Sequence, residues 1–403
     1  MERFHLVCRA CRKSRKFQLA LERCSCGGSF VVEYDLEQVQ NTLSKESLLE
    51  RPSTMWRYWE LLPVRDSSNI VSLGEGWTPL VRLHRAEKAL SVAKLWVKRE
   101  EQNPTGSFKS RGFSAAVSIA KEYGVSKVAV NSNGNAASAL AAYAAYAGME
   151  AYVFVPQDCP GLIVEECVGY GAHTVLVYGL IHDAGKIIQD GKAEQGWHHV
   201  GTLKEPGRAE GKKTMGLELA EQLAWKLPDV IVYPTGGGSG VIGMWNAFRQ
   251  LKELGMAHGD LPRFVSVQEA GCQPLVDAVQ AGRFAEQNSD VTSAPTGMRV
   301  PNPPDGDWLL SILRETNGTA VAVSGEEIRN ASIHLGKLGI SSSPEGAATW
   351  AGFCRLREQG WIRPHDEVVL FNTSHAMKYM HWPVKNVPIV KNYADWVTHP
   401  RRM

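Results

Sequence analysis

Short apolar runs typical of strands alternate along most of this chain with stretches of helical periodicity. The runs Leu95–Lys98, Val128–Val130 and Asp229–Pro234 are each followed by turn residues and then by a helix-like segment. Further strand-like runs lie at Ala151–Pro156 and Thr174–Val177. Two parallel strands need a long crossover between them, which is usually a helix. The alternation therefore predicts the α/β class, with parallel sheets covered by helices.

Two of the predicted strand-to-helix turns carry residues suited to ligand binding. Asn131–Ser138 follows the strand at Val128–Val130, and Thr235–Gly240 follows the strand at Asp229–Pro234. Turns after the strands of an open parallel sheet are where ligands bind. The second turn is rich in glycine and leads into a helix predicted over Val241–Leu254. Its backbone N–H groups are thus expected to point at an anion such as phosphate.

A lysine lies close to the start of another predicted helix. Asn103–Gly112 contains the turn and cap residues Pro104, Gly106 and Ser107 and precedes an apolar run of helical spacing. The positive end of the helix dipole disfavours an ammonium, so this is a poor place for a structural cation. It suits a lysine whose pKa must fall so that its amine can form an imine. That residue is Lys109; on chemistry alone, a solvated surface lysine is the commoner alternative.

Four cysteines lie close together near the beginning of the sequence, beside strand-like runs at Phe17–Leu21 and Phe30–Tyr34. They are Cys8, Cys11, Cys24 and Cys26. Two Cys pairs on adjacent hairpin turns can surround a zinc ion tetrahedrally and so hold together a unit too small for its own core. The first pair is Cys-x-x-Cys, but the second is the tighter Cys-x-Cys. A structural zinc site and a ribbon that has lost its metal are the two alternatives, and an open catalytic zinc site is disfavoured because no His or carboxylate accompanies the thiols.

Charge and hydropathy disfavour several classes of function. The net charge of +2 has no basic patch behind it, so a nucleic acid is not expected as a partner. No run reaches the roughly 18 apolar residues of a membrane span, and the first residues lack the apolar segment of a signal peptide. We expect a cytoplasmic protein that binds no membrane, and its eight cysteines are not expected to form a disulfide framework.

A cluster of aromatic residues precedes the first predicted strand. Arg51–Pro63 carries Trp56, Tyr58 and Trp59 at roughly helical spacing. We expect a helix whose aromatic side chains pack onto a partner surface or a neighbouring subunit.

The stretch around Lys109, Asn-Pro-Thr-Gly-Ser-Phe-Lys-x-Arg-Gly, resembles the Schiff-base lysine motif of threonine synthases. These are enzymes of the tryptophan-synthase-β-like class (fold type II), which use pyridoxal 5′-phosphate (PLP). The resemblance extends from about Ser72 to Tyr379 and implies two open parallel-sheet domains preceded by a zinc-ribbon-like extension. The implied units are a Cys-rich extension at 1–36, a helical linker at 37–70, a catalytic region at 71–390 with its smaller domain at about 113–200, and a tail at 391–403.

The same resemblance assigns roles to individual residues. Lys109 would be catalytic, since it would hold the cofactor as an imine and move protons of the substrate. The cofactor would be bound by Phe108, by Asn135 at its phenolic oxygen, by Thr373 at its pyridine nitrogen, and at its phosphate by Gly236, Gly237, Gly238, Ser239 and Gly240. The substrate would be bound by Ser132, Asn133 and Gly134 at its carboxylate and by Arg208 at its phosphate, with Lys204 as a further anion contact. Pro295–Pro301 would face the cofactor ring, and Glu345 fits both a helix-dipole partner and an active-site group.

Departures from the family pattern leave the substrate open. They are Ser110, Asn133, Leu203 and Ser374. The leading hypothesis is a threonine synthase, a carbon–oxygen lyase that converts O-phospho-L-homoserine and water to L-threonine and phosphate. One alternative is β-replacement or β-elimination on O-phosphoserine or another β-substituted amino acid, as in cysteate synthases and threonine/serine dehydratases. Another is a non-catalytic interaction protein that retains the fold. The resemblance also implies a homodimer with a small-molecule amino-acid substrate.

Overall fold

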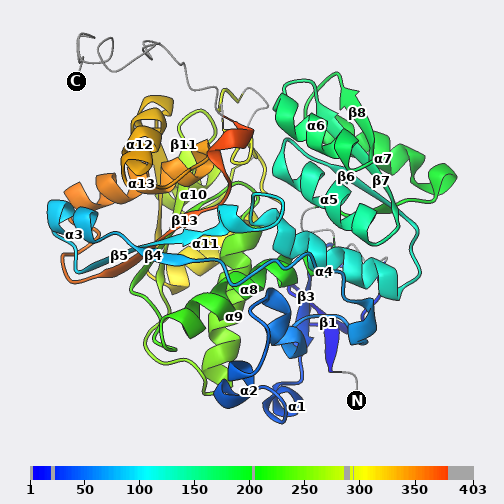
Figure 1. Ribbon diagram of the computed structural model, residues 1–403, viewed down its shortest axis with the longest axis horizontal. Coiled ribbons are helices and arrows are strands. Elements are labelled where there is room, and N and C mark those ends of the chain that lie inside the picture. Colours follow the sequence, from blue (N-terminus) through cyan, green and yellow to red (C-terminus); the bar gives the residue numbers. More distant parts are fainter. Residues whose placement is uncertain (1–2, 20–22, 202–204, 286–290, 294, 380–403) are drawn as a thin grey trace, which may run out of the picture.

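The computed structural model describes residues 3–19, 23–201, 205–285, 291–293 and 295–379. Within these ranges the strands form three separate sheets. Figure 1 shows the small N-terminal sheet at the bottom, the larger α/β part at the left and the smaller α/β part at the upper right. No helix in the described ranges is both long and apolar enough to cross a membrane. The tail predicted at 391–403 and the predicted anion contact Lys204 lie outside the described residues.

The larger sheet has six strands in the order β12-β11-β10-β13-β5-β4. Its strands are β4 (Leu80–Arg82), β5 (Lys94–Arg99), β10 (Val230–Pro234), β11 (Arg263–Glu269), β12 (Thr319–Val323) and β13 (Glu367–Asn372). Neighbouring strands are parallel except at the edge, where β4 runs antiparallel to β5. The helices of this part are α3 (His84–Leu90), α8 (Gly207–Gln222), α9 (Ser239–Glu253), α10 (Pro274–Ala281), α11 (Gly306–Glu315), α12 (Gly325–Lys337) and α13 (Pro344–Glu358).

Both faces of the larger sheet are covered. Every residue of β10 and of β13 is buried, as expected for central strands of a parallel sheet. Ile231 belongs to one hydrophobic core, together with residues of α8, α9 and α11, whereas Val232 belongs to the core formed with α12 and α13. Successive residues of one strand therefore anchor two different helix layers.

The smaller sheet has four strands in the order β8-β7-β6-β9, all parallel. Its strands are β6 (Lys127–Asn131), β7 (Glu150–Pro156), β8 (His173–Val177) and β9 (His198–His199). The helices of this part are α4 (Lys109–Glu122), α5 (Asn135–Tyr146), α6 (Gly161–Gly169) and α7 (Ile181–Gln195). Short 3-10 segments elsewhere in the chain are η2 (Ser67–Asn69), η3 (Glu100–Gln102) after β5, and η4 (Ala376–Lys378) after β13. The predicted strand–helix alternation is thus confirmed, and with it the α/β class with parallel sheets.

The N-terminal sheet is antiparallel, with the order β2-β1-β3. Its strands are β1 (Phe4–Cys8), β2 (Ser14–Arg15) and β3 (Phe30–Tyr34), and the helices α1 (Leu36–Gln40) and α2 (Lys45–Leu49) follow. The strand predicted at Phe17–Leu21 is wrong for its described residues, because pairing with β1 ends at Arg15. Phe17 instead packs edge-on against Phe4, with 5.3 Å between ring centroids.

The aromatic cluster packs within the chain, so the predicted packing of Trp56 and Tyr58 onto a partner surface or a neighbouring subunit is wrong. The segment is the 3-10 element η1 (Met55–Leu61). Trp56 donates its ring N–H to Glu75 (3.0 Å), and Tyr58 donates its hydroxyl to Glu221 of α8. Both rings are buried. Because buried aromatic N–H and O–H groups need acceptors, these two carboxylates determine which way the rings face.

Helix α8 packs closely against α4 on one side and α9 on the other. A Cβ atom at Gly211 would lie 2.1 Å from the carbonyl oxygen of Arg111, and one at Gly243 would lie 2.9 Å from the backbone nitrogen of Lys213. Only glycine allows backbones to approach this closely. As a result, the N-terminal turns of α4, α8 and α9 lie together.

A network of buried charges joins α4, α8 and β5. Arg111 pairs with Glu100 (2.7 Å) and with Glu218 (2.8 Å), and Lys98 also pairs with Glu218. All four side chains are completely shielded from solvent. Each of these charges has an opposite charge beside it, which a charge in a protein interior requires.

Candidate active site

Lys109 is the first residue of α4, as the sequence predicts. The segment before it is fixed to the turn that follows β13. The Phe108 N–H donates to the carbonyl oxygen of Thr373 (3.0 Å), and Ser107 forms an isolated bridge with Ser374. The lysine therefore projects from a backbone that is held at two adjacent points.

The environment of Lys109 disfavours the charged amine. Burial, and secondly the nearby guanidinium of Arg208, lower the pKa of Lys109 to about 7, and the Glu345 carboxylate acts in the opposite direction. The Lys109 ammonium nitrogen lies 4.2 Å from the centroid of the Phe108 ring. The lowered pKa agrees with the prediction, and its largest cause is burial. In a large share of the molecules, Lys109 is therefore a neutral amine near pH 7, and the neutral amine is the nucleophilic form.

The glycine loop connects β10 to α9. Gly238 has a φ of +77°, a left-handed conformation that favours glycine, and α9 begins at Ser239. A Cβ atom at Gly236 would lie 2.6 Å from the carbonyl oxygen of Gly297, so this backbone is in close contact with the segment around residue 297. The first N–H groups of a helix have no partner within it, and the N-terminus of α9 is accordingly a place where phosphate can bind.

The turn after β6 faces the turn after β13. The Ser132 hydroxyl accepts a hydrogen bond from the Gly134 N–H (3.0 Å), which shapes the loop that contains Asn133. Asn135 is the first residue of α5, and its side-chain amide donates to the Ser374 hydroxyl (2.9 Å) and to the Tyr379 hydroxyl (2.5 Å). These bonds join the smaller α/β part to the segment that follows β13.

The segment around residue 297 completes the surroundings of Lys109. A Cβ atom at Gly134 would lie 3.6 Å from the Thr296 hydroxyl, and the Gly297 N–H donates to Glu345 (3.0 Å). Glu345 lies in the first turn of α13. Since its charge acts on Lys109, Glu345 belongs to the site as well as to the start of its helix.

Arg208 is buried near Lys109. It donates to the carbonyl oxygen of Val200 (2.8 Å), its Nε has no partner among the described residues, and its guanidinium lies 4.2 Å from the centroid of the Phe113 ring. Burial, partly offset by Glu205, lowers the pKa of Arg208 to about 10. Arg208 therefore stays charged near neutral pH, and its Nε–H, which has no partner among the described residues, can donate to an anion.

Two residues at this site were not predicted. Lys212 lies one helical turn after Arg208, a spacing that could have indicated it, and donates to Ser239 of the glycine loop (2.7 Å). Tyr379 contacts Asn135 through its hydroxyl, and no sequence pattern indicates it.

The residues around Lys109 fit PLP. Three buried polar atoms nearby have no hydrogen-bond partner among the described residues: Asn135 Oδ1, Thr296 Oγ1 and Glu345 Oε2. Buried polar groups are nearly always paired in native proteins, so these atoms are available to a polar ligand beside the lysine. Thr373 is buried, its carbonyl oxygen accepts the N–H of Phe108 beside Lys109, and the N-terminus of α9 supplies donors for a phosphate. A cavity of about 800 Å³ lies elsewhere, between the N-terminal sheet and α11, and none of these residues lines it.

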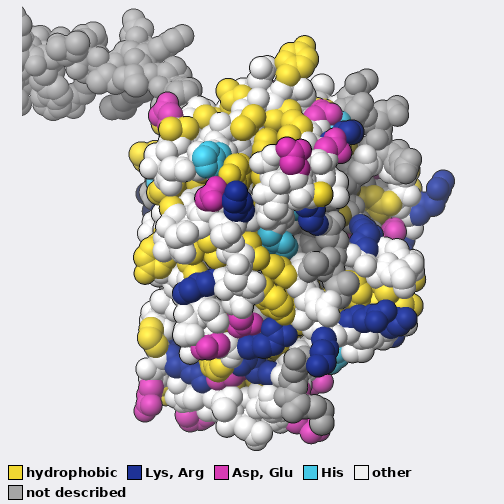
Figure 2. Space-filling model, turned by 90° about the vertical axis from the view of Figure 1, so that its right-hand side faces the viewer, with side chains coloured by type: hydrophobic (Ala, Val, Ile, Leu, Met, Phe, Trp, Pro, Cys, Tyr) yellow, Lys and Arg dark blue, Asp and Glu magenta, His cyan; other side chains and the backbone are white. Residues whose placement is uncertain are grey.

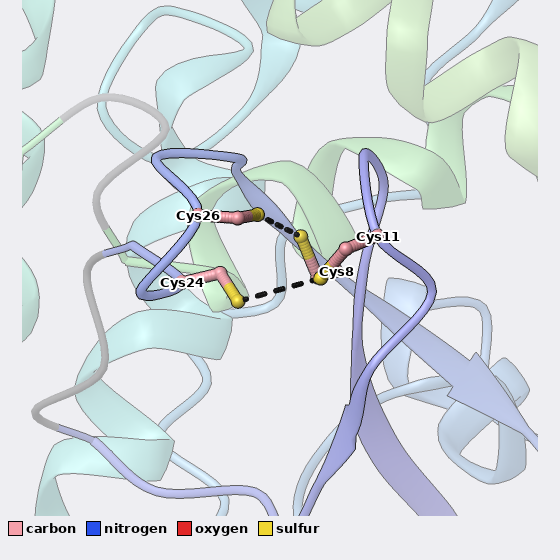
Figure 3. Close-up of side chains that lie close together, drawn as sticks. All are labelled: Cys8, Cys11, Cys24 and Cys26. Carbon is pink, nitrogen blue, oxygen red and sulfur yellow. Dashed lines mark hydrogen bonds between the residues drawn. The ribbon is translucent and has the colours of Figure 1, made fainter.

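The four cysteines form a second site (Figure 3). Cys8 and Cys11 lie on one hairpin turn and Cys24 and Cys26 on the facing one, with all four sulfur atoms within 4.8 Å of one another. The Cys8–Cys26 and Cys11–Cys24 sulfur distances are 3.4 and 3.7 Å. A Cβ atom at Gly28 would lie 2.7 Å from the Cys8 sulfur, so glycine there lets the turns approach. Four thiols at this separation suit tetrahedral zinc, and we propose a structural zinc ion here despite the short Cys-x-Cys spacing.

Changing Cys11 to serine is expected to remove most of the bound zinc. Structural zinc sites contribute to folding directly, so the variant should also melt at a lower temperature. Metal analysis of the purified protein, with and without a chelator, and thermal melting measure both effects. Cys354→Ser, outside the cluster, is the control and should keep its zinc. Protein purified with zinc present in the medium but containing none would contradict the proposal.

Known proteins resemble this chain over most of its length. The family model described as "Pyridoxal-phosphate dependent enzyme" matches residues 71–374. A threonine synthase of Methanocaldococcus jannaschii is 34% identical over 379 residues, covering 92% of this chain and 92% of the relative. A threonine synthase of Methanosarcina acetivorans is 35% identical over 381 residues, covering 93% of this chain and 92% of the relative.

Solved structures give the same fold at lower identity. A serine racemase of maize has a TM-score of 0.65 at 21% identity, covering 74% of this chain and 88% of the other. A threonine deaminase of Solanum lycopersicum has a TM-score of 0.63 at 21% identity, covering 74% of this chain and 79% of the other. At this identity the likeness concerns the fold alone, which is the predicted tryptophan-synthase-β-like fold.

Proposed function

We propose that this chain, which belongs to the pyridoxal-phosphate-dependent enzymes and among them to the threonine synthase family, converts O-phospho-L-homoserine and water to L-threonine and phosphate. The observation that carries the proposal is the position of Arg208. Its guanidinium is buried beside Lys109 and retains an unpaired N–H group among the described residues. A substrate with a phosphate leaving group supplies the anion that such a cation requires.

Each residue of the site has a role in this proposal. PLP, when bound, stabilises the carbanion formed on the substrate. Lys109 holds the cofactor and, once the substrate has displaced it, its amine moves the proton at the α-carbon and those at the β-carbon. The loop of Ser132, Asn133 and Gly134 binds the substrate carboxylate, and Arg208 binds the phosphate that leaves.

The remaining assignments concern the cofactor. Asn135 faces its phenolic oxygen, Phe108 packs beside it, and the loop from Gly236 to Gly240 binds its phosphate. Thr373 presents a neutral hydroxyl to the pyridine nitrogen. A hydroxyl leaves that nitrogen unprotonated, which moderates electron withdrawal and suits elimination and replacement chemistry.

Elimination or replacement on O-phosphoserine, or on another β-substituted amino acid, is the second candidate. It is favoured by Ser374, whose hydroxyl accepts a hydrogen bond from Asn135. Members of the family that this chain resembles often carry glycine at this position. A bulkier turn beside Asn135 leaves less room next to the substrate loop, which suits a shorter substrate.

A screen of phosphate release tests the proposed reaction. The PLP-loaded protein is incubated separately with O-phospho-L-homoserine, O-phosphoserine, threonine and serine, and phosphate, amino-acid products and the 2-oxo acids formed by elimination are measured. Release of phosphate with formation of threonine from O-phospho-L-homoserine is the expected result. No turnover of this compound, with turnover of O-phosphoserine or serine, would overturn the proposal in favour of the second candidate.

Arg208→Ala is expected to raise the KM for O-phospho-L-homoserine about 10- to 100-fold, because a charge-assisted hydrogen bond to the phosphate is lost. Steady-state kinetics measures this. Arg249→Ala removes an exposed arginine of α9 and should leave KM unchanged. If Arg208→Ala keeps its KM while the protein remains folded, Arg208 does not bind the substrate phosphate.

We also propose that the protein is a cytoplasmic homodimer. The resemblance to the family is the main support for the dimer. In addition, hydrophobic side chains gather on the face shown in Figure 2. Exposed hydrophobic side chains of the smaller α/β part include Val168, Leu176 and Tyr178. Exposed apolar patches commonly mark protein interfaces. Light scattering in solution tests the dimer.

A further inference from the structure

Lys212 is a buried lysine that touches the glycine loop. It lies in the second turn of α8, where its side chain is completely buried. Its Nζ donates to the hydroxyl of Ser239, the first residue of α9 (2.7 Å). The same nitrogen lies 5.8 Å from the centroid of the Phe108 ring. Lys212 therefore occupies the space between the lysine segment and the start of α9.

No carboxylate among the described residues forms an ion pair with Lys212. The next residue shows the contrast: Lys213 is equally buried but pairs with Glu210 (2.5 Å). An ammonium that is taken out of water without an opposite charge is strongly disfavoured. Lys213 is therefore satisfied within the protein, whereas Lys212 has only the neutral hydroxyl of Ser239.

The surroundings of Lys212 add to its electrostatic cost. Burial, and then the positive charges of Arg208 and Lys109, lower its pKa well below the ordinary value, and Glu205 opposes this effect. The pKa of Glu205 is itself raised to about 7 by burial, despite hydrogen bonds from Gly207 and Arg208, so its negative charge is incomplete near neutral pH. The positive end of α9 also disfavours a cation at this position. An anion between Lys212 and the start of α9 would relieve all of these effects.

We propose that Lys212 is the cation that binds the phosphate of PLP at the glycine loop. The N–H groups at the start of α9 and the Lys212 ammonium then bind the phosphate from two sides. Ser239 links the two sides, because it begins α9 and accepts a hydrogen bond from Lys212. A charge-assisted contact of this kind is about twice as strong as a neutral hydrogen bond. Lys212 therefore makes the protein bind PLP more tightly than the backbone N–H groups would alone.

The assignment of Lys212 rests on the proposal that the protein binds PLP and does not depend on which reaction it catalyses. It stands whether the substrate is O-phospho-L-homoserine or a shorter amino acid. The substrate phosphate is a second possible source of the anion. We assign the cofactor phosphate to Lys212 because its hydrogen bond goes to Ser239 of the glycine loop, whereas the Arg208 guanidinium donates to the carbonyl oxygen of Val200.

The test compares PLP with pyridoxal, the same molecule without its phosphate. Dissociation constants of both are measured by spectroscopic titration of the apoprotein for the wild type and for Lys212→Gln. Glutamine keeps a hydrogen-bond donor of similar length for Ser239 but carries no charge. We expect PLP to bind on the order of 10- to 100-fold more weakly to the variant, with pyridoxal binding changed by less than about twofold.

Two further variants make the comparison specific. Lys212→Arg retains a cation and should keep most of the preference for PLP over pyridoxal. Lys213→Gln removes the neighbouring buried lysine and should lower the melting temperature while leaving that preference unchanged. Thermal melting of each variant shows that it is folded before titration.

Three results would overturn the proposal. The first is an equal loss of PLP and pyridoxal binding in folded Lys212→Gln, which indicates a structural role. The second is unchanged PLP binding with a raised KM for a phosphorylated substrate, which moves Lys212 to the substrate. The third is loss of the preference for PLP in Lys212→Arg and Lys213→Gln alike, which shows that charge at residue 212 is not the cause.

Discussion

Replacing Lys109 by alanine is expected to abolish turnover and the visible absorption of the lysine-bound cofactor. Two losses combine. The side chain that would hold the cofactor covalently is gone, and so is the amine that would move the substrate protons. Proton transfer by a positioned side chain alone contributes about 10²- to 10⁴-fold to the rate, so kcat should fall by at least that factor. Absorption spectra of the purified protein and steady-state kinetics measure the two losses separately.

Two control variants separate the role of the amine from the role of its charge. Lys109→Arg keeps a cation at the start of α4, yet an arginine does not lose its proton near neutral pH, so it should be as inactive as the alanine variant. Lys121→Ala removes a lysine from the last turn of the same helix and should behave as the wild type. Full activity of folded Lys109→Ala, or an unchanged visible spectrum, would refute the assignment.

Local sequence patterns were enough to predict the position of Lys109 and the fold class. The prediction of the helix start rests on Pro104, Gly106 and Ser107, which lie within five residues of the lysine. Strand and helix periodicity is likewise a property of neighbouring residues. Predictions of this kind need no knowledge of which distant segments meet.

Contacts between distant segments could not be predicted in this way. Lys213 lies three residues after Glu210, a spacing that indicates an ion pair along one helix, but only the fold shows that Lys212 donates to Ser239, 27 residues away. The inward packing of Trp56 was missed for the same reason, since one of its acceptors, Ser114, lies 58 residues further along the chain. At such separations, the partner of a buried polar group depends on tertiary packing rather than on spacing.

The buried network around Glu218 is the part of the fold where one substitution should cost the most stability. Changing Glu218 to glutamine leaves Lys98 with only neutral partners, the Thr78 carbonyl (2.6 Å) and the Gln222 side chain (2.9 Å). It also removes one of the two carboxylates that pair with Arg111. Removing one partner of a buried ion pair typically costs about 3–5 kcal/mol, because the remaining charge stays buried and uncompensated.

Denaturant unfolding of the wild type and of Glu218→Gln measures this cost. Glu253→Gln, which changes an exposed residue at the end of α9, is the matched control and should shift the free energy of unfolding by less than about 0.5 kcal/mol. A Glu218→Gln variant as stable as this control would show that the network contributes no net stability. Replacing the whole network by apolar residues can be neutral, so the prediction concerns the single substitution only.

The same network predicts how the difference in unfolding free energy between wild type and Glu218→Gln depends on pH. Burial alone would raise the pKa of Glu218, but the charges of Arg111 and Lys98 outweigh it and lower the pKa from 4.5 to about 2. A carboxylate with a lowered folded-state pKa stabilises the fold above its unfolded pKa, and this contribution is lost as the pH falls toward the folded value. The stability difference between wild type and Glu218→Gln should therefore be constant above about pH 4.5 and shrink from there toward pH 2. A difference that persists unchanged to the lowest pH at which the protein folds would mean that Glu218 does not act through its charge.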